Sequence, residues 1–196
     1  MKKEINFYSS ITKEHIRELP ARKFEGRIFI IDKFKKIAGI KNSMQNIKIF
    51  GFDTETKPSF RKGKINNTAL IQLATSEDAF LFRINLIGIP DFLVDIFENN
   101  DIIKVGVALK HDLNSLQKLK PFKPAGFIDL QHSVEQFGIK DKGLKKLAAN
   151  ILGLRIKKGQ QTSNWESKVL KQIQLEYAAT DAWVCYEIYN KLSLSL

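Results

Sequence analysis

The stretch IKIFGFDTET, residues 47–56, joins an apolar segment to two acidic side chains. Its aromatic and β-branched residues are typical of a strand, and side chains in a strand alternate between its two faces. Asp53 and Glu55 therefore share one side at the end of the strand. Two carboxylates so close repel each other unless a cation or a shared proton compensates. The simpler interpretation is that the strand emerges here into a solvated loop.

The segments on either side predict an α/β domain. Further strands are expected at residues 26–32, 69–75, 79–84, 102–108 and 127–130. Helices are expected at residues 90–97, 109–119, 132–137, 143–152 and 168–192. Ser76, Glu77 and Asp78 separate two of the strands and indicate a hairpin. A hairpin followed by alternating strands and helices indicates a mixed sheet flanked by helices.

A third acid, Asp112, flanks an apolar stripe close to a predicted helix start. Leu109, Leu113 and Leu116 recur at helical spacing directly after the strand at residues 102–108. An acid near a helix N-terminus is ordinarily explained by capping or by the helix dipole. Taken alone, Asp112 fits that explanation.

A fourth acid, Asp181, lies in the C-terminal helix on the stripe that we expect to face the core. An acid in such a line is costly without a partner. Tyr177 lies one turn earlier on the same face, so its hydroxyl could point to the same place. A hydrogen-bonded Tyr–Asp pair in the core is the simpler alternative. The predicted stripe consists of Val169, Ile173, Tyr177, Val184 and Ile188.

The charge of the chain indicates a polyanionic partner. The 196 residues hold 32 Lys and Arg against 21 Asp and Glu, a formal net charge of +11. The surplus is concentrated in residues 1–46, 57–64 and 140–158, whereas residues 65–103 are acidic. Solvated surface is the ordinary use of lysine. Three separate basic blocks nevertheless favour nucleic-acid binding.

The composition excludes several classes of protein. Cys185 is the one cysteine, so neither a disulfide scaffold nor a cysteine-rich zinc site fits. No apolar run approaches the ~20 residues that span a bilayer, so no membrane partner is expected. No apolar segment follows Lys2 and Lys3, so no secretory signal is visible. We expect a soluble, intracellular protein of the cytoplasm.

Four acids on three elements favour a hard divalent cation. Oxygen ligands without convergent His or Cys suit Mg²⁺ or Mn²⁺ and not zinc. The three histidines have no metal-binding spacing, and the glycine motifs of nucleotide-binding loops are absent from the sequence. No nucleophilic serine motif is present either. Basic blocks around an acidic metal site indicate two-metal phosphodiester chemistry.

Three short motifs resemble those of a known family. FDTET at 52–56, VGVALKHDL at 105–113 and YAATDA at 177–182 resemble the motifs of the DEDDy 3′–5′ exonucleases. This superfamily contains ribonuclease D and the proofreading domains of DNA polymerases. The sequence GLKKLAANILG and the region from Ser-Asn-Trp at 163–165 onward are similar to the exonuclease domain of the Werner syndrome helicase. The resemblance covers residues 26 to 192.

The resemblance implies a ribonuclease H-like fold, with a mixed five-stranded sheet that has one antiparallel strand and is flanked by helices. It also implies a 3′–5′ exonuclease that releases nucleoside 5′-monophosphates. Tyr177 takes the position that names the DEDDy branch and would orient the attacking water. The acids that would hold two divalent ions, Mg²⁺ or Mn²⁺, at the 3′ end of a nucleic acid are Asp53, Glu55, Asp112 and Asp181.

Substrate contacts are expected beside these acids. Trp165 could stack on a base, but packing of the loop before the last helix is the simpler interpretation. His111 could equally be a surface or capping residue, and Cys185 is expected to be a small core residue. The predicted nucleic-acid-binding residues are Thr56, Lys57, Arg61, Lys62, Lys64 and Lys110.

The domain prediction is a basic N-terminal extension at residues 1–25 and a single exonuclease domain at residues 26–196. The nucleic acid would be DNA, RNA or both. The alternative is a nucleic-acid-binding module on the same fold that has lost catalysis. A proofreading or processing domain that works with a separate helicase, polymerase or RNA-processing partner is a further possibility, and the basic N-terminal block could recruit that partner or bind nucleic acid.

Overall fold

A six-stranded mixed sheet forms the centre of the computed structural model, which describes residues 7–59, 66–157 and 159–194. The strand order is β2-β5-β4-β3-β6-β7. In chain order the strands are β2 (Arg27–Ile31), β3 (Ile49–Thr56), β4 (Thr68–Ala74), β5 (Asp78–Phe82), β6 (Ile103–Gly106) and β7 (Phe127–Asp129). Strand β4 is antiparallel to both of its neighbours, and the other pairs are parallel.

The α/β class and the single antiparallel strand are confirmed. The six strands match the six segments that the sequence pattern predicts, whereas the count of five that the resemblance implies is wrong. Strand β2 extends the sheet by pairing in parallel with the edge of β5, where Arg27 lies opposite Asp78. The Arg27 guanidinium donates to the Asp78 carboxylate at 2.7 and 2.9 Å across this pair of strands. The aromatic and β-branched sequence RIFII suits the position.

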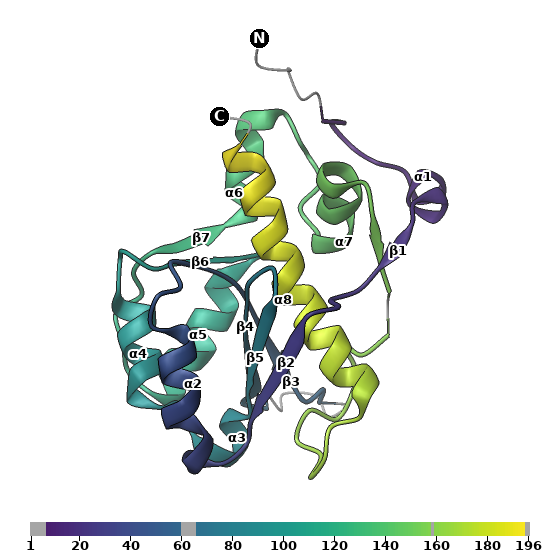
Figure 1. The fold of residues 1–196 in the computed structure, drawn as a ribbon. Coiled ribbons are helices and arrows are strands. Elements are labelled where there is room, and N and C mark those ends of the chain that lie inside the picture. Colours follow the sequence, from purple (N-terminus) through teal and green to yellow (C-terminus); the bar gives the residue numbers. More distant parts are fainter. Residues whose placement is uncertain (1–6, 60–65, 158, 195–196) are drawn as a thin grey trace.

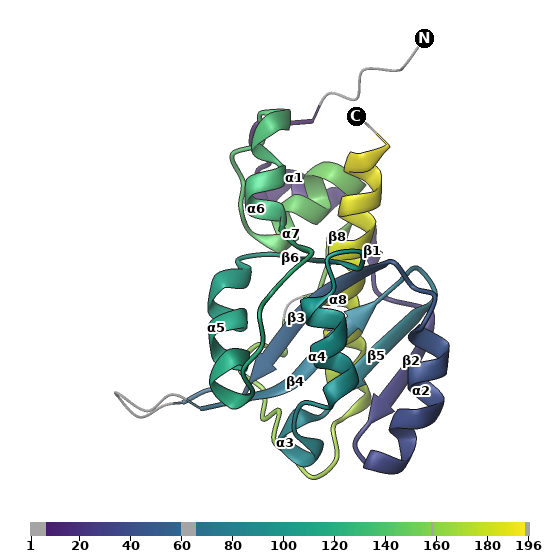
Figure 2. The ribbon, with the colours of Figure 1, turned by 90° about the vertical axis from the view of Figure 1, so that its left-hand side faces the viewer.

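Helices cover both faces of the sheet (Figure 1). One face carries α2 (Ile37–Met44), α4 (Asp91–Glu98) and α5 (Leu109–Leu119), and the other carries the long α8 (Gln172–Ser193). Figure 2 shows three further helices at the end of the molecule where α8 finishes. They are α1 (Lys13–Glu18), α6 (Leu130–Ser133) and α7 (Leu144–Leu147). The short α3 (Ile84–Ile87) follows β5 directly.

The alternation of side chains along β3 divides the core into two layers. Phe50 and Phe52 are buried in the cluster that includes residues of α4 and α5. Gly51, Asp53 and Glu55 therefore point to the opposite face, which α8 covers. A Cβ atom on Gly51 would lie 1.8 Å from the carbonyl oxygen of Ala182 in α8. The absence of a side chain at this position is what allows α8 to cross directly over β3.

The predicted C-terminal helix is correct in existence and wrong in its start. It begins at Gln172, where the backbone N–H of Lys171 donates to the Gln174 side chain at 2.9 Å. Val169 precedes the helix and is 77% exposed, and Ile173 is 57% exposed, so neither belongs to the inward stripe. Val184 and Ile188 are fully buried, as expected.

The described part of the N-terminal segment packs against distant parts of the chain. Strand β1 (Ala21–Arg22) pairs in parallel with β8 (Arg155–Ile156). The backbone N–H of Phe24 donates to the Thr180 hydroxyl of α8 at 3.0 Å. The Asp141 carboxylate accepts from the backbone N–H of Ile11 at 2.8 Å. These contacts hold residues 11–24 beside α8 and the region before it. No helix in the described residues is both long and apolar enough to cross a membrane.

Candidate active site

Three acidic side chains converge between β3 and α8. Asp53 and Glu55 extend from β3, and Asp181 extends from α8 above it. One carboxylate oxygen from each residue lies within 4.8 Å of the others. Glu55 is 8% exposed and Asp181 is 6% exposed, so β3 does not emerge into solvent here. The crossing at Gly51 is the structural reason for this convergence.

Asp112 is not one of the three converging acids, but it lies close enough for its charge to act on Asp53 and Glu55. It lies in the first turn of α5, and the Thr54 hydroxyl donates to its carboxylate at 2.5 Å. The helix is capped by a different acid, because the backbone N–H groups of Ala108 and Leu109 donate to Asp129 at 3.1 and 3.0 Å. Asp112 is therefore not needed as the cap. Sequence reasoning missed Asp129. The available signal was its position at the end of β7, the strand that pairs with β6.

Tyr177 and Asp181 form a pair on α8. The residues are one helical turn apart on the same side of the helix. Burial raises the pKa of Asp181 to about 6, and the neighbouring Tyr177 hydroxyl and the charge of Lys145 oppose this rise. Burial also raises the pKa of Tyr177 well above its usual value, with a further contribution from the charge of Asp181. The tyrosine thus remains a hydroxyl donor next to the acids.

The cluster favours a bound cation on electrostatic grounds. Burial, followed by the charges of Asp53, Asp181 and Asp112, raises the pKa of Glu55 from 4.5 to about 10. Burial and the charges of Asp181 and Asp112 also raise the pKa of Asp53. Carboxylates that repel each other out of water are stabilised in their charged form by a nearby positive ion. The all-oxygen donor set suits a hard divalent metal.

A buried amide beside the acids adds to this fit. Gln72 of β4 lies directly opposite Asp53 of β3 in the sheet register. Its side chain is fully buried, and neither its amide nitrogen nor its amide oxygen has a hydrogen-bond partner among the described residues. Buried polar groups are rarely left unpaired, and bound water or an ion commonly accounts for the exceptions. Sequence reasoning missed Gln72 because a single polar residue within an apolar strand is not by itself a signal of a functional site.

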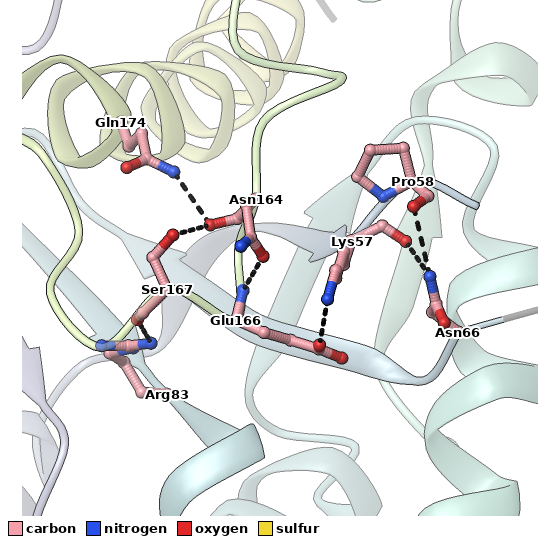
Figure 3. A network of polar contacts seen from close by, with 8 residues as sticks. All are labelled: Lys57, Pro58, Asn66, Arg83, Asn164, Glu166, Ser167 and Gln174. Atoms are coloured by element: carbon pink, nitrogen blue, oxygen red, sulfur yellow. Dashed lines mark hydrogen bonds and ion pairs between the residues drawn. The ribbon is translucent and has the colours of Figure 1, made fainter. Parts of the chain in front are cut away.

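The loop before α8 is held by a network of polar contacts (Figure 3). The guanidinium of Arg83 donates to the carbonyl oxygens of Ser167 and Lys168 at 2.5 and 3.0 Å. The Gln174 amide donates to the carbonyl oxygen of Asn164 at 3.4 Å. Trp165 is fully buried within this loop, so the packing interpretation of Trp165 is correct.

The predicted substrate residues are only partly brought to the site. Thr56 ends β3 at a register shift that follows Glu55. The Lys57 ammonium pairs with Glu166 of the loop before α8 at 3.1 Å (Figure 3). Lys110 is exposed two residues before Asp112. Arg61, Lys62 and Lys64 lie outside the described residues. His111 is exposed and Cys185 is buried, as expected for a surface residue and a small core residue.

Comparison with known proteins identifies the family to which the chain belongs. The model of the 3′–5′ exonuclease family matches residues 28–196. A putative 3′–5′ exonuclease of Acanthamoeba polyphaga mimivirus is 36% identical over 173 residues, which cover 79% of this chain and 43% of that protein. The bifunctional 3′–5′ exonuclease/ATP-dependent helicase WRN of Mus musculus is 33% identical over 150 residues, or 74% of this chain and 11% of that protein.

A solved structure agrees with the sequence comparison. The crystal structure of the Aedes aegypti Nibbler EXO domain matches with a TM-score of 0.79 at 26% identity, over 89% of this chain and 92% of that chain. The chain therefore belongs to the 3′–5′ exonuclease family, and the WRN exonuclease is among its relatives. It spans less than half the length of the two curated relatives described above.

Proposed function

We propose that this protein is a metal-dependent 3′–5′ exonuclease, which hydrolyses phosphodiester bonds from the 3′ end of a nucleic acid and releases nucleoside 5′-monophosphates. The observation that carries the proposal is the convergence of Asp53, Glu55 and Asp181 within 4.8 Å, in a chain of this family. The positive surplus elsewhere in the chain supports a polyanionic substrate.

The carboxylates would hold two divalent ions, Mg²⁺ or Mn²⁺. Asp53, Glu55 and Asp181 would supply oxygen ligands directly, and Asp112 would contribute its carboxylate through water. Such ions supply a hydroxide nucleophile at neutral pH and neutralise charge on the leaving 3′ oxygen. The chain itself positions the groups: Thr54 orients Asp112, and Gln72 provides an amide beside Asp53. The Tyr177 hydroxyl, next to Asp181, would orient the attacking water.

A 5′-labelled oligonucleotide with a free 3′ end tests the proposal. With Mg²⁺ or Mn²⁺ we expect a ladder of products that shorten one nucleotide at a time, and EDTA should abolish it because the carboxylates then lack their cations. A circular oligonucleotide of the same composition is the matched control, since it has no end. Cleavage of the circle, or a ladder that persists in EDTA, would contradict the proposal. Matched DNA and RNA oligonucleotides identify the preferred nucleic acid.

Tyr177→Phe removes one hydroxyl and leaves the ring packed against Trp165. We expect turnover to fall by up to about 10²-fold, because the attacking water loses a positioning group. The midpoint of metal binding, measured by titration calorimetry, should stay within error of that of the unmodified chain. Unchanged turnover would remove Tyr177 from the mechanism, and lost metal binding would give it a different role.

The alternative proposal, a nucleic-acid-binding module without catalysis, predicts binding of the same oligonucleotide with no ladder under any metal. The four acids and Tyr177 favour the enzyme over this alternative. A separate helicase, polymerase or RNA-processing chain stays a proposal as partner. It is supported by the greater length of relatives such as WRN, which is named a helicase as well as an exonuclease.

A further inference from the structure

A cavity opens beside the acids on the side of α8 that faces the N-terminal segment. It has a volume of about 130 Å³ and lies between β1, the residues that follow β8, and the first turns of α8. Tyr177 and Asp181 form one wall, so the cavity is continuous with the candidate active site. The residues that face them across the cavity are Arg22, Lys23, Lys157 and Gln160.

Backbone contacts fix the position of this opposite wall. Strand β1 pairs with β8 so that Arg22 lies next to Ile156, the residue before Lys157. The Arg155 side chain donates to the Leu19 carbonyl oxygen at 2.9 Å, and its backbone N–H donates to the Pro20 carbonyl oxygen at 2.9 Å. Two basic residues that are far apart in the sequence are thereby brought to one side of the cavity.

The basic side chains that line the cavity differ in whether an acid of the chain neutralises them. Lys23 forms an ion pair with Glu176 at 3.0 Å, so these two side chains largely neutralise each other. Arg22 makes no ion pair in the described part of the chain, and Lys157 contributes only to the field that lowers the pKa of Glu176. Arg22 and Lys157 therefore present positive charge toward the cavity, next to a cluster of acids that a polyanionic substrate must approach.

The cavity also has an apolar surface. Ile173 lies one turn before Tyr177 on α8 and is 57% exposed, so its side chain offers apolar surface to the cavity that it lines. The sequence pattern had placed Ile173 in the core. An exposed isoleucine and a tyrosine ring beside two cations match the chemistry of a nucleotide, which has an apolar base and sugar next to a phosphate.

We propose that this cavity is a nucleotide subsite of the active site, in which Arg22 and Lys157 bind a phosphate while Ile173 and Tyr177 contact the adjoining sugar or base. The inference rests on the proposed exonuclease function and adds a substrate contact from the N-terminal segment. It makes the pairing of β1 with β8 part of substrate recognition.

The test measures binding of a 5′-labelled single-stranded oligonucleotide to the full chain by fluorescence anisotropy, with EDTA to prevent turnover. Arg22→Ala and Lys157→Ala should each weaken binding several-fold. Each should also reduce the slope of log affinity against log salt by about 0.7, the value for one phosphate contact on a single strand. Arg17→Ala and Lys140→Ala are the matched controls, since both residues are exposed, belong to the same basic blocks and do not line the cavity.

Two ligands distinguish the source of the phosphate. If 5′-AMP binding weakens in Arg22→Ala together with oligonucleotide binding, the cavity takes the terminal nucleotide or the released product. If only oligonucleotide binding weakens, it takes a phosphate further along the strand. Both results support the subsite. Binding by Arg22→Ala and Lys157→Ala that equals the two controls, with unchanged melting temperatures, would overturn it.

The subsite and the proposed function fail separately. If the unmodified chain produces no ladder on any oligonucleotide while Arg22→Ala weakens binding, the exonuclease proposal fails and the subsite stands. If the chain produces the ladder while Arg22→Ala and Lys157→Ala keep the KM of the controls, the subsite fails and the exonuclease proposal stands.

Discussion

Gly51→Ala is expected to lower the free energy of unfolding by at least about 3 kcal/mol, at the upper end of what overpacking costs in a core. The added methyl group would lie 1.8 Å from the Ala182 carbonyl oxygen and 2.8 Å from the backbone nitrogen of Tyr186. Both are backbone atoms in the middle of α8, so no side-chain rotation relieves the contact. Either α8 moves away from β3 or the domain unfolds.

The same substitution is expected to reduce nuclease activity even in the fraction that folds. Asp181 belongs to α8 and Asp53 belongs to β3. A wider separation of the two elements therefore moves their carboxylates apart. Urea unfolding gives the stability, and the oligonucleotide assay gives the activity at a temperature where the variant is folded.

Gly39→Ala is the matched control. Gly39 lies inside α2, and a Cβ atom there would meet nothing within 4 Å. Because alanine is about 1 kcal/mol better than glycine inside a helix, Gly39→Ala should stabilise the protein slightly. A Gly51→Ala variant whose free energy of unfolding lies within about 1 kcal/mol of that of the unmodified chain would contradict the close crossing of α8 over β3.

The arrangement of the acids on β3 followed from the sequence because one short strand carries both the alternation and the chemistry. Phe50 and Phe52 face one core, so Asp53 and Glu55 had to share the other face. Each acid had an ordinary explanation when it was considered alone. The four together, with Tyr177 one turn from Asp181, left the metal centre as the common explanation.

Side-chain contacts across the fold could not be read from periodicity. The segment at residues 102–108 was predicted as a buried apolar strand, yet Lys104 within it is fully buried. Its ammonium donates to the carbonyl oxygens of Ile96, Asn99 and Ile102 at 2.8, 2.8 and 2.6 Å. Ile96 lies in the last turn of α4, and the other two residues lie in the loop after it. No pattern within β6 specifies those partners, because they belong to the preceding helix and loop.

The start of α8 shows a second limit of the pattern. Val169 and Ile173 continue the spacing of the inward stripe, but the helix begins only at Gln172, and the loop before it is held by Arg83 of a distant segment. Helical spacing therefore extended the prediction through residues whose conformation is fixed by tertiary contacts. Ile173 lies inside α8, yet its side chain is 57% exposed and lines the cavity at Arg22, which helical spacing alone does not indicate.

Asp53→Asn is expected to have the largest effect on activity and the opposite effect on stability. Turnover should fall by at least about 10³-fold, because a residue that would hold the metal ions loses its charge and several kcal/mol of transition-state stabilisation are lost. Without metal, however, the variant should unfold at higher temperature, with a gain of about 0.5–2 kcal/mol. The reason is that Asp53 repels Asp181 and Asp112 and raises the pKa of Glu55.

The pH dependence separates this explanation from a general effect of the substitution. Because the pKa of Glu55 rises from 4.5 to about 10 on folding, the folded chain keeps a proton that the unfolded chain releases. In EDTA the free energy of unfolding should therefore fall as the pH rises between these two values, and the fall should be smaller in Asp53→Asn. Below pH 4.5 both states are protonated, so this contribution to instability is absent.

Melting temperatures in EDTA and in excess Mg²⁺ or Mn²⁺ measure both effects, with Asp95→Asn as the matched control, since Asp95 is an exposed acid on α4. Metal should raise the melting temperature of the unmodified chain and of Asp95→Asn alike, and most at high pH, where the carboxylates are charged and unscreened. It should raise that of Asp53→Asn much less. An Asp53→Asn variant that is less stable in EDTA at every pH would mean that the acids are already neutralised by groups of the chain itself, and the need for a cation would lose its physical basis.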